Sequence, residues 1–194
     1  TTNVCTFVNA LLDTGNTAPF ISKRAAKVLK LTGHVQDLTV QGVGGRVSKY
    51  DGALVSRVDI CDTVGKKLTS ATVRVIESPA GDLHAFDWSK VKDDIDILRD
   101  LDLNRPVERG AVDLILGVDQ PSLLSHTEER ISLNGCTAAR LTPFGWVAFG
   151  ATSPSVSEGG GDESNFLAFQ AELKVKESRE TGAEPQGRQS RLWS

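Results

Sequence analysis

The sequence predicts a mainly β fold with a few short helices. Short segments in which apolar and polar residues partly alternate, such as residues 55–60 and 71–75, are typical of β-strands. Turn-forming residues separate these segments, as at Asp51-Gly52 and Gly65. Hydrophobic residues make up 39% of the 194 residues, which is enough to build the core of one domain.

The first part of the chain combines strands with one helix. Strands are expected over residues 4–12, 35–40, 53–60 and 68–76. A short helix is expected over residues 22–31, because Ser22 can cap its start. Ala25, Val28 and Leu29 are spaced to share one face of this helix.

A second helix is expected over residues 88–101. Apolar residues recur there every three or four positions, at Trp88, Val91, Ile95 and Leu98. The opposite face carries several aspartates, which indicate a solvated surface and not a metal site.

The remaining elements follow a compact apolar strand over residues 112–116, which ends at Gly117. A short helix is expected from Asp119, with Pro121 tolerated in its first turn. Two closing strands are then expected over residues 138–141 and 146–149.

The composition changes after Gly150, where the stretch SPSVSEGGGDES reads as a linker. Residues 1–150 are therefore expected to form the folded domain, and residues 151–194 a mostly disordered linker or tail. Residues 166–173 are the one part of that tail expected to form a brief helix. The chain has no methionine and begins at Thr1, so we expect it to be a piece of a longer protein, such as a processed polyprotein.

The net charge of −3 gives no electrostatic basis for binding nucleic acid or an anionic membrane. No apolar run is long enough to span a bilayer. The three scattered cysteines suit a reducing compartment. No Cys or His pair has zinc-ligand spacing, so neither a metal nor a cofactor is expected.

Asp13-Thr14-Gly15 interrupts the first apolar strand at its end. Gly15 permits a tight turn and close approach of a partner, and the Thr14 hydroxyl can fix the loop by hydrogen bonding. Two facing carboxylates that share one proton can hydrolyse a peptide bond, because the ionised one activates water and the protonated one binds the carbonyl oxygen. One such carboxylate does not suffice.

The chain offers no good second copy of this motif. Asp62-Thr63-Val64-Gly65 has an extra residue and reads as a plain turn between strands, and Asp113 precedes an apolar run instead of ending one. One motif in a domain of this size predicts a symmetric homodimer, with the active site on the twofold axis.

Several motifs in this order resemble the retropepsin group of aspartic proteases, and more narrowly the protease domain in the Pol polyprotein of Bel/Pao-type LTR retrotransposons. They are ALLDTGNTAPFIS, the QGVGG turn, Trp88 before an acidic segment, VDLILGVD and ARLTPFGWVAFG. The resemblance implies a closed acid-protease barrel, a homodimer with one catalytic Asp from each subunit, and a mobile flap. It also implies cleavage of polyprotein junctions in the cytoplasm, within virus-like particles.

The resemblance also implies roles for individual residues. Asp13 would be the catalytic acid and base, Thr14 would brace the two active-site loops, and Gly15 would bring the backbone close to the polypeptide substrate. The flap tip would comprise Gly42, Val43, Gly44 and Gly45. The wall of the site would comprise Ile115, Leu116 and Gly117.

Three features depart from the family pattern. Asn16 stands where a small residue is common, residues 77–110 are longer than in compact viral enzymes, and only 12 residues precede Asp13. A strand that supports the fold or the dimer is therefore expected to be missing. The alternative is a non-catalytic module for dimerisation or binding, or an inactive retroelement relic.

Other enzyme classes have less support. The chain lacks the G-x-S-x-G turn of many serine hydrolases, and GVGGRV lacks the Lys-Ser/Thr ending of a phosphate-binding loop. A carboxylate pair for glycoside cleavage stays open, although nothing in the sequence positions one.

Overall fold

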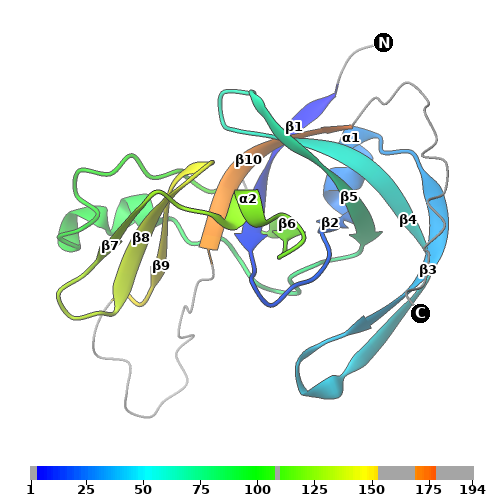
Figure 1. Cartoon of the computed structure of the whole chain (residues 1–194), viewed down its shortest axis with the longest axis horizontal. Coiled ribbons are helices and arrows are strands. Elements are labelled where there is room, and N and C mark those ends of the chain that lie inside the picture. Colours follow the sequence, from blue (N-terminus) through cyan, green and yellow to red (C-terminus); the bar gives the residue numbers. More distant parts are fainter. Residues whose placement is uncertain (1–3, 108–109, 153–168, 178–194) are drawn as a thin grey trace, which may run out of the picture.

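Six strands form a closed mixed β-barrel, so the expected mainly β class is confirmed. The computed structural model describes residues 4–107, 110–152 and 169–177. Around the barrel the strand order is β10-β1-β6-β2-β5-β4, and β10 pairs with β4 to close it (Figure 1). These strands are β1 (Cys5–Leu12), β2 (Phe20–Ser22), β4 (Val47–Cys61), β5 (Lys67–Ile76), β6 (Val112–Leu116) and β10 (Phe169–Glu177).

The pairing of β6 determines where the first loop lies. β1 runs parallel to β6, with Leu12 opposite Leu116. β2 runs antiparallel to β6, with Phe20 opposite Ile115. β6 therefore lies between two strands that are consecutive in the chain, and the loop that joins them crosses the end of β6.

A long hairpin extends from the barrel. β3 (His34–Gln41) pairs only with β4 in this sheet, and the 3-10 turn η1 (Val43–Gly45) forms the hairpin tip (Figure 1). The strand expected over residues 53–60 is much longer than predicted, because its first part continues the pairing with β3 up to Val47.

Helix α1 (Lys23–Leu29) begins where the sequence predicts. The Oγ atom of Ser22 accepts a hydrogen bond from the backbone N–H of Ala25 at 3.0 Å, which caps the helix. Ala25 and Leu29 are buried in the core, but Val28 is exposed, so its expected place on the buried face is wrong. No helix in the described ranges has the length and apolar character needed to cross a membrane.

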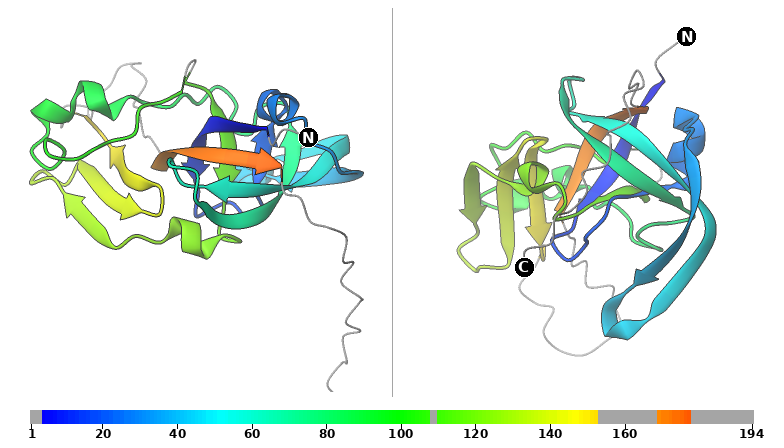
Figure 2. Two further views of the ribbon diagram at one scale, coloured as in Figure 1. Left: turned by 90° about the horizontal axis from the view of Figure 1, so that it is seen from above. Right: turned by 45° about the vertical axis from the view of Figure 1, so that its right-hand side comes forward.

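A second, smaller sheet lies beside the barrel (Figure 2). It comprises β7 (Glu128–Ile131), β8 (Thr137–Thr142) and β9 (Gly145–Gly150), and α2 (Pro121–Leu124) precedes it in the chain. The two expected closing strands are thereby confirmed. The expected short helix is also present, but it begins at Pro121, two residues after the predicted start at Asp119. β7 has no apolar alternation and was not expected.

The helix expected over residues 88–101 is wrong. The segment contains two short 3-10 turns, η2 (Trp88–Lys90) and η3 (Lys92–Asp94), followed by further turns. The Asp87 side chain accepts a hydrogen bond from the Ser89 N–H, in keeping with the preference of aspartate for turns over helix interiors. The apolar spacing still identified core residues, because Trp88, Ile95 and Leu98 pack against the small sheet.

The brief helix expected within residues 166–173 is also wrong for the part that the structure describes, where β10 is a strand. β10 pairs antiparallel with β1 along its length and with β4 near its end. Val175 is fully buried, and the Nζ atom of Lys176 lies 3.7 Å from Oδ2 of Asp59 on β4. The barrel thus includes a strand from beyond residue 150. Residues 153–168 and 178–194 of the expected tail lie outside the described ranges.

Candidate active site

Asp13 lies at the end of β1, where the chain turns across β6. Its backbone N–H donates to the carbonyl of Leu116 at 2.9 Å, and its own carbonyl accepts from the N–H of Asn16 at 3.1 Å. Its Oδ1 atom accepts from the N–H of Gly15 at 2.8 Å. Its Oδ2 atom accepts no hydrogen bond from a described residue, so this oxygen is available to an outside group.

The three motif residues differ in exposure. Asp13 is half-buried, whereas Thr14 and Gly15 are exposed. The Thr14 hydroxyl makes no hydrogen bond within the described chain. The loop therefore presents one carboxylate oxygen and one hydroxyl to whatever approaches this end of the barrel.

Residues 115–117 support this loop from below. Ile115 and Leu116 are buried in β6, and the backbone of Gly117 passes directly beneath Asn16. A Cβ atom on Gly117 would lie 2.2 Å from the carbonyl oxygen of Asn16, so no side chain fits there. The next N–H, from Val118, donates to that same oxygen at 2.9 Å. The structure thus brings residues 13–15 and 115–117 together.

Asn16 is integrated into the loop. Its Nδ2 atom donates to the carbonyl of Ala18 at 2.5 Å, and its backbone carbonyl is the one that Val118 contacts. Asparagine is well suited to such local side-chain-to-backbone bonds. The departure from the family pattern at this position therefore leaves the turn closed.

Among the described residues, the backbone hydrogen bonds of the hairpin tip are local. Gly42 N–H donates to the Arg46 carbonyl at 2.7 Å, and Gly45 N–H donates to the Gly42 carbonyl at 3.2 Å. Gly44 and Gly45 have φ angles of 71° and 75°, which glycine adopts most easily. The tip and the β1–β2 loop both project toward the lower side of the barrel in Figure 1, but no hydrogen bond among the described residues joins them.

The other candidate carboxylates have structural roles. Asp113 on β6 is buried and accepts hydrogen bonds from Ser22 Oγ at 2.6 Å and Arg24 Nε at 3.2 Å. The Nη2 atom of Arg24 pairs with its second oxygen. Sequence reasoning missed this pair, although a carboxylate inside an apolar strand requires a buried partner.

The second Asp-Thr sequence forms a turn, as predicted. Asp62 Oδ1 accepts from the N–H of Lys66 at 2.7 Å, and Gly65 N–H donates to the Asp62 carbonyl. Along the part of the chain that the structure describes, only the loop at Asp13 combines a strand end, a supporting glycine and an available carboxylate oxygen.

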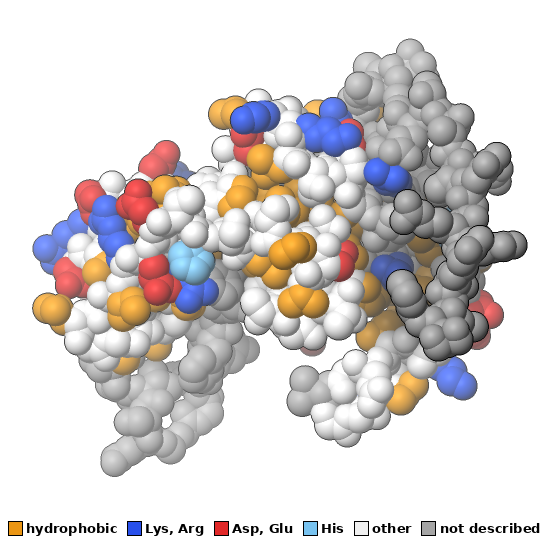
Figure 3. Space-filling view, viewed as in Figure 1, with side chains coloured by type: hydrophobic (Ala, Val, Ile, Leu, Met, Phe, Trp, Pro, Cys, Tyr) orange, Lys and Arg blue, Asp and Glu red, His pale blue; other side chains and the backbone are white. Residues whose placement is uncertain are grey.

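The visible surface shows no strong segregation of charge. Figure 3 shows basic and acidic side chains intermixed over the small sheet and its covering segment. No group of three or more His, Cys, Asp or Glu side chains in the described ranges is arranged to hold a metal ion.

Comparison of the chain with family models, with curated proteins and with solved structures gave no match. The site is therefore defined by its own geometry: one aspartate at a strand end, anchored by the neighbouring strand, in a barrel with a long glycine-tipped hairpin.

Proposed function

We propose that the chain is a retropepsin-like aspartic endopeptidase that cleaves polyprotein junctions as a homodimer. The observation that carries the proposal is the anchoring of the Asp13 loop. The Asp13 backbone N–H donates to the Leu116 carbonyl, and the Gly15 N–H donates to Oδ1 of the Asp13 carboxylate, while Oδ2 accepts no bond from a described residue. A single available carboxylate oxygen at the end of a rigid strand is half of the dyad that this chemistry needs.

The proposed reaction uses Asp13 from each of two copies. Two carboxylates held close together share one proton, because both cannot ionise at that distance. The ionised Asp13 takes a proton from water as the water oxygen attacks the scissile carbonyl carbon. The protonated Asp13 of the other copy donates to the carbonyl oxygen. The tetrahedral intermediate then collapses, the C–N bond breaks, and the amine leaves with a proton from the dyad.

The surrounding residues have positioning roles in this proposal. Thr14 braces the two loops across the twofold axis, and Ile115, Leu116 and Gly117 form the wall beneath. The hairpin tip, Gly42 to Gly45, closes over a bound polypeptide. Its exposed glycines with positive φ angles are compatible with such movement.

The decisive experiment compares the full chain with Asp13→Asn on a set of polyprotein-derived peptides, read by mass spectrometry. Asp→Asn keeps the shape but removes the proton chemistry, so we expect cleavage to fall by roughly 10²–10⁴-fold. Asp62→Asn is a matched control in a structural turn and should cleave at the parent rate. Equal cleavage by Asp13→Asn and the parent would refute the mechanism.

A mixing experiment tests the shared site. Adding an excess of Asp13→Asn to the parent should lower its activity, because mixed dimers contain only one intact aspartate. Sedimentation on the same samples measures dimerisation separately. A stable dimer that hydrolyses no peptide would favour the non-catalytic module, and a strict monomer that cleaves would exclude a shared dyad.

A further inference from the structure

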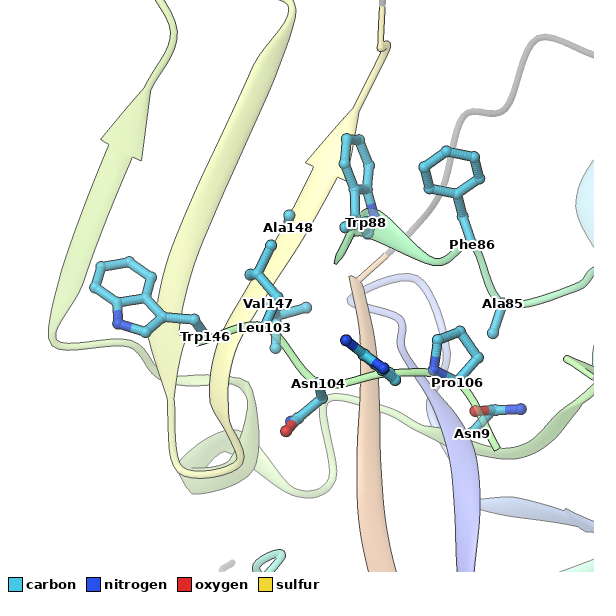
Figure 4. Close-up of a pocket in the computed structure, with 11 residues that line it drawn as sticks. Asn9, Ala85, Phe86, Trp88, Leu103, Asn104, Pro106, Trp146, Val147 and Ala148 are labelled. Atoms are coloured by element: carbon cyan, nitrogen blue, oxygen red, sulfur yellow. The ribbon is translucent and has the colours of Figure 1, made fainter. Parts of the chain in front are cut away.

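A small cavity lies between the barrel and the small sheet, away from the Asp13 loop. Its volume is about 20 Å³, which is room for one or two groups of the size of a water molecule. Asn9 of β1 lines one side, Val147 and Ala148 of β9 line another, and Trp88 of η2 lies above both in the view of Figure 4.

Trp88, which lines this cavity, carries an unpaired hydrogen-bond donor. The side chain is only 4% exposed, and its Nε1 atom has no partner. Within the described ranges it is the one buried side-chain nitrogen or oxygen in that condition. In Figure 4 its nitrogen-bearing edge is on the side toward Asn104 and Pro106. A buried N–H without an acceptor costs free energy, so a group that supplies an acceptor here is favoured.

The asparagines of the cavity wall are already engaged. Asn9 donates from Nδ2 to the Ala111 carbonyl and accepts at Oδ1 from the Val107 N–H, each at 3.0 Å. Asn104 donates from Nδ2 to the Phe144 carbonyl at 2.9 Å. These bonds hold the wall in place, so the asparagines stabilise the shape of the cavity and Trp88 supplies the available donor.

The charge of the lining selects the sign of a ligand. Arg105 is exposed at the rim and makes no ion pair with a described residue, and the residues that line the cavity include no carboxylate. A guanidinium and an indole N–H that line one cavity match an anion with hydrogen-bond acceptors. Phe86 and Trp146 add aromatic surface that suits an apolar stem behind such a head group.

We propose that this cavity binds a carboxylate, with one oxygen accepting from Trp88 Nε1 and the charge neutralised by Arg105. The volume admits the head group alone, so the rest of the ligand lies outside, against the aromatic rim. The same chemistry is offered by a small organic acid and by the C-terminus of a polypeptide. The proposal does not depend on catalysis at Asp13.

The test observes the indole N–H directly by NMR of the ¹⁵N-labelled full chain. The chain has three tryptophans, and Trp88→Phe assigns the Trp88 signal by its disappearance. Acetate, N-acetylglycine and acetamide are titrated at constant ionic strength. We expect a saturable shift of the Trp88 signal with a carboxylate and none with acetamide. A response to acetate indicates a small acid, and a response to N-acetylglycine alone indicates a chain terminus.

Two variants separate the site from a general charge effect. Arg105→Gln should weaken carboxylate binding by about tenfold or more, since it removes a charge-assisted contact. Lys90→Gln removes an equal charge from an exposed side chain outside the cavity lining and should leave binding unchanged. The proposal is overturned if neither carboxylate shifts the Trp88 signal, if acetamide shifts it equally, or if Arg105→Gln binds as tightly as the parent.

Discussion

The loop at Asp13 and the tip of the β3–β4 hairpin both depend on glycine, for opposite reasons. Gly117 under the Asp13 loop has no room for a side chain, since a Cβ atom would meet the Asn16 carbonyl at 2.2 Å. At the hairpin tip, a Cβ on Gly44 or Gly45 would meet nothing within 4 Å. There the requirement is a backbone angle, because both residues have positive φ.

The Asp13 loop is the fixed part of the candidate site, and the hairpin tip is the part that can move. The Asp13 loop is bonded to the end of β6 and packed onto it, so its carboxylate keeps one position. The glycines of the hairpin tip are exposed, and their hydrogen bonds to described residues are local, so the tip can change conformation at little cost in packing. A hydrolytic dyad needs the first property, and a cover that admits a polypeptide needs the second.

The largest effect on stability is expected for Gly117→Ala. The added methyl group collides with backbone, which cannot rotate away as a side chain can, so we expect a loss of about 3 kcal/mol in the free energy of unfolding. Urea unfolding measures it. If cleavage activity exists, it should fall as well, because relief of the clash requires the Asp13 loop to shift. A loss near zero would show that the Asp13 loop is not packed tightly on Gly117, and would contradict the distinction between this loop and the hairpin tip.

Arg24→Met tests the ion pair that holds β6, the strand to which the Asp13 loop is bonded. The variant leaves the Asp113 carboxylate, 2% exposed, with Ser22 as its remaining polar partner. Removing the partner of a buried charge is costly. Because the Arg24 side chain is itself 46% exposed, we expect a loss of only about 2 kcal/mol in the free energy of unfolding. Lys23→Met is the matched control.

In the control, Lys23 pairs with Glu77 at 2.6 Å, and both side chains are exposed, unlike the buried Asp113. Its loss should cost less than about 0.5 kcal/mol. Thermal or urea unfolding of both variants measures the difference between their losses of stability. Equal losses would mean that Asp113 does not rely on Arg24, and that β6 is held by its strand pairing alone.

Local sequence patterns predicted β1 and β6, two of the three strands on which the Asp13 loop depends, but not the short strand β2. Alternation identified parts of β4 and β5, and the compact apolar run before Gly117 identified β6. The hydroxyl of Ser22 identified the start of α1, and the extra residue in Asp62–Gly65 identified a plain turn. Each of these depends on neighbours within a few residues, so a single sequence contains the necessary information.

The missed elements depend on partners that are distant in the chain. Apolar residues alternate along β10, at Phe169, Ala171, Leu173 and Val175, which is a strand pattern. The segment forms a strand because it pairs with β1 and β4, which are distant in the sequence. The spacing in residues 88–101 satisfies a helix and a series of turns equally well. The buried pair of Arg24 with Asp113 joins residues 89 positions apart.

Gly44→Ala should have a smaller effect than Gly117→Ala, although both add one methyl group. Only backbone strain opposes it, because the site is open, and a non-glycine residue at positive φ costs roughly 1 kcal/mol. Gly44→Asn should recover part of that loss, because asparagine tolerates this conformation better. Urea unfolding of the three glycine variants ranks them. A Gly44→Ala loss as large as that of Gly117→Ala would contradict the distinction between packing and conformation.

The smallest effect is expected outside both regions, for Asp100→Asn in the segment that covers the small sheet. Arg130 donates to Asp100 at 2.6 Å, and this hydrogen bond is the main reason that the pKa of Asp100 lies below its usual value. A carboxyl whose pKa is lower in the folded state stabilises the fold above its unfolded pKa and loses that contribution as the pH falls through the folded pKa. The variant should therefore be slightly less stable than the parent at neutral pH and equal to it in strong acid.

Because Asp100 is exposed and the Arg130 side chain is half-buried at the surface, salt should also reduce the difference at neutral pH. Arg130 additionally lies 5.1 Å from the ring centroid of Trp146, so the substitution is made at Asp100, which leaves that contact in place. Urea unfolding of the parent and the variant at neutral and acidic pH, with and without salt, measures both the pH dependence and the salt dependence of the stability difference. A stability difference that persists in acid would show that Asp100 acts through packing of the segment that covers the small sheet, and not through its charge. That segment would then be held as firmly as the loop at Asp13.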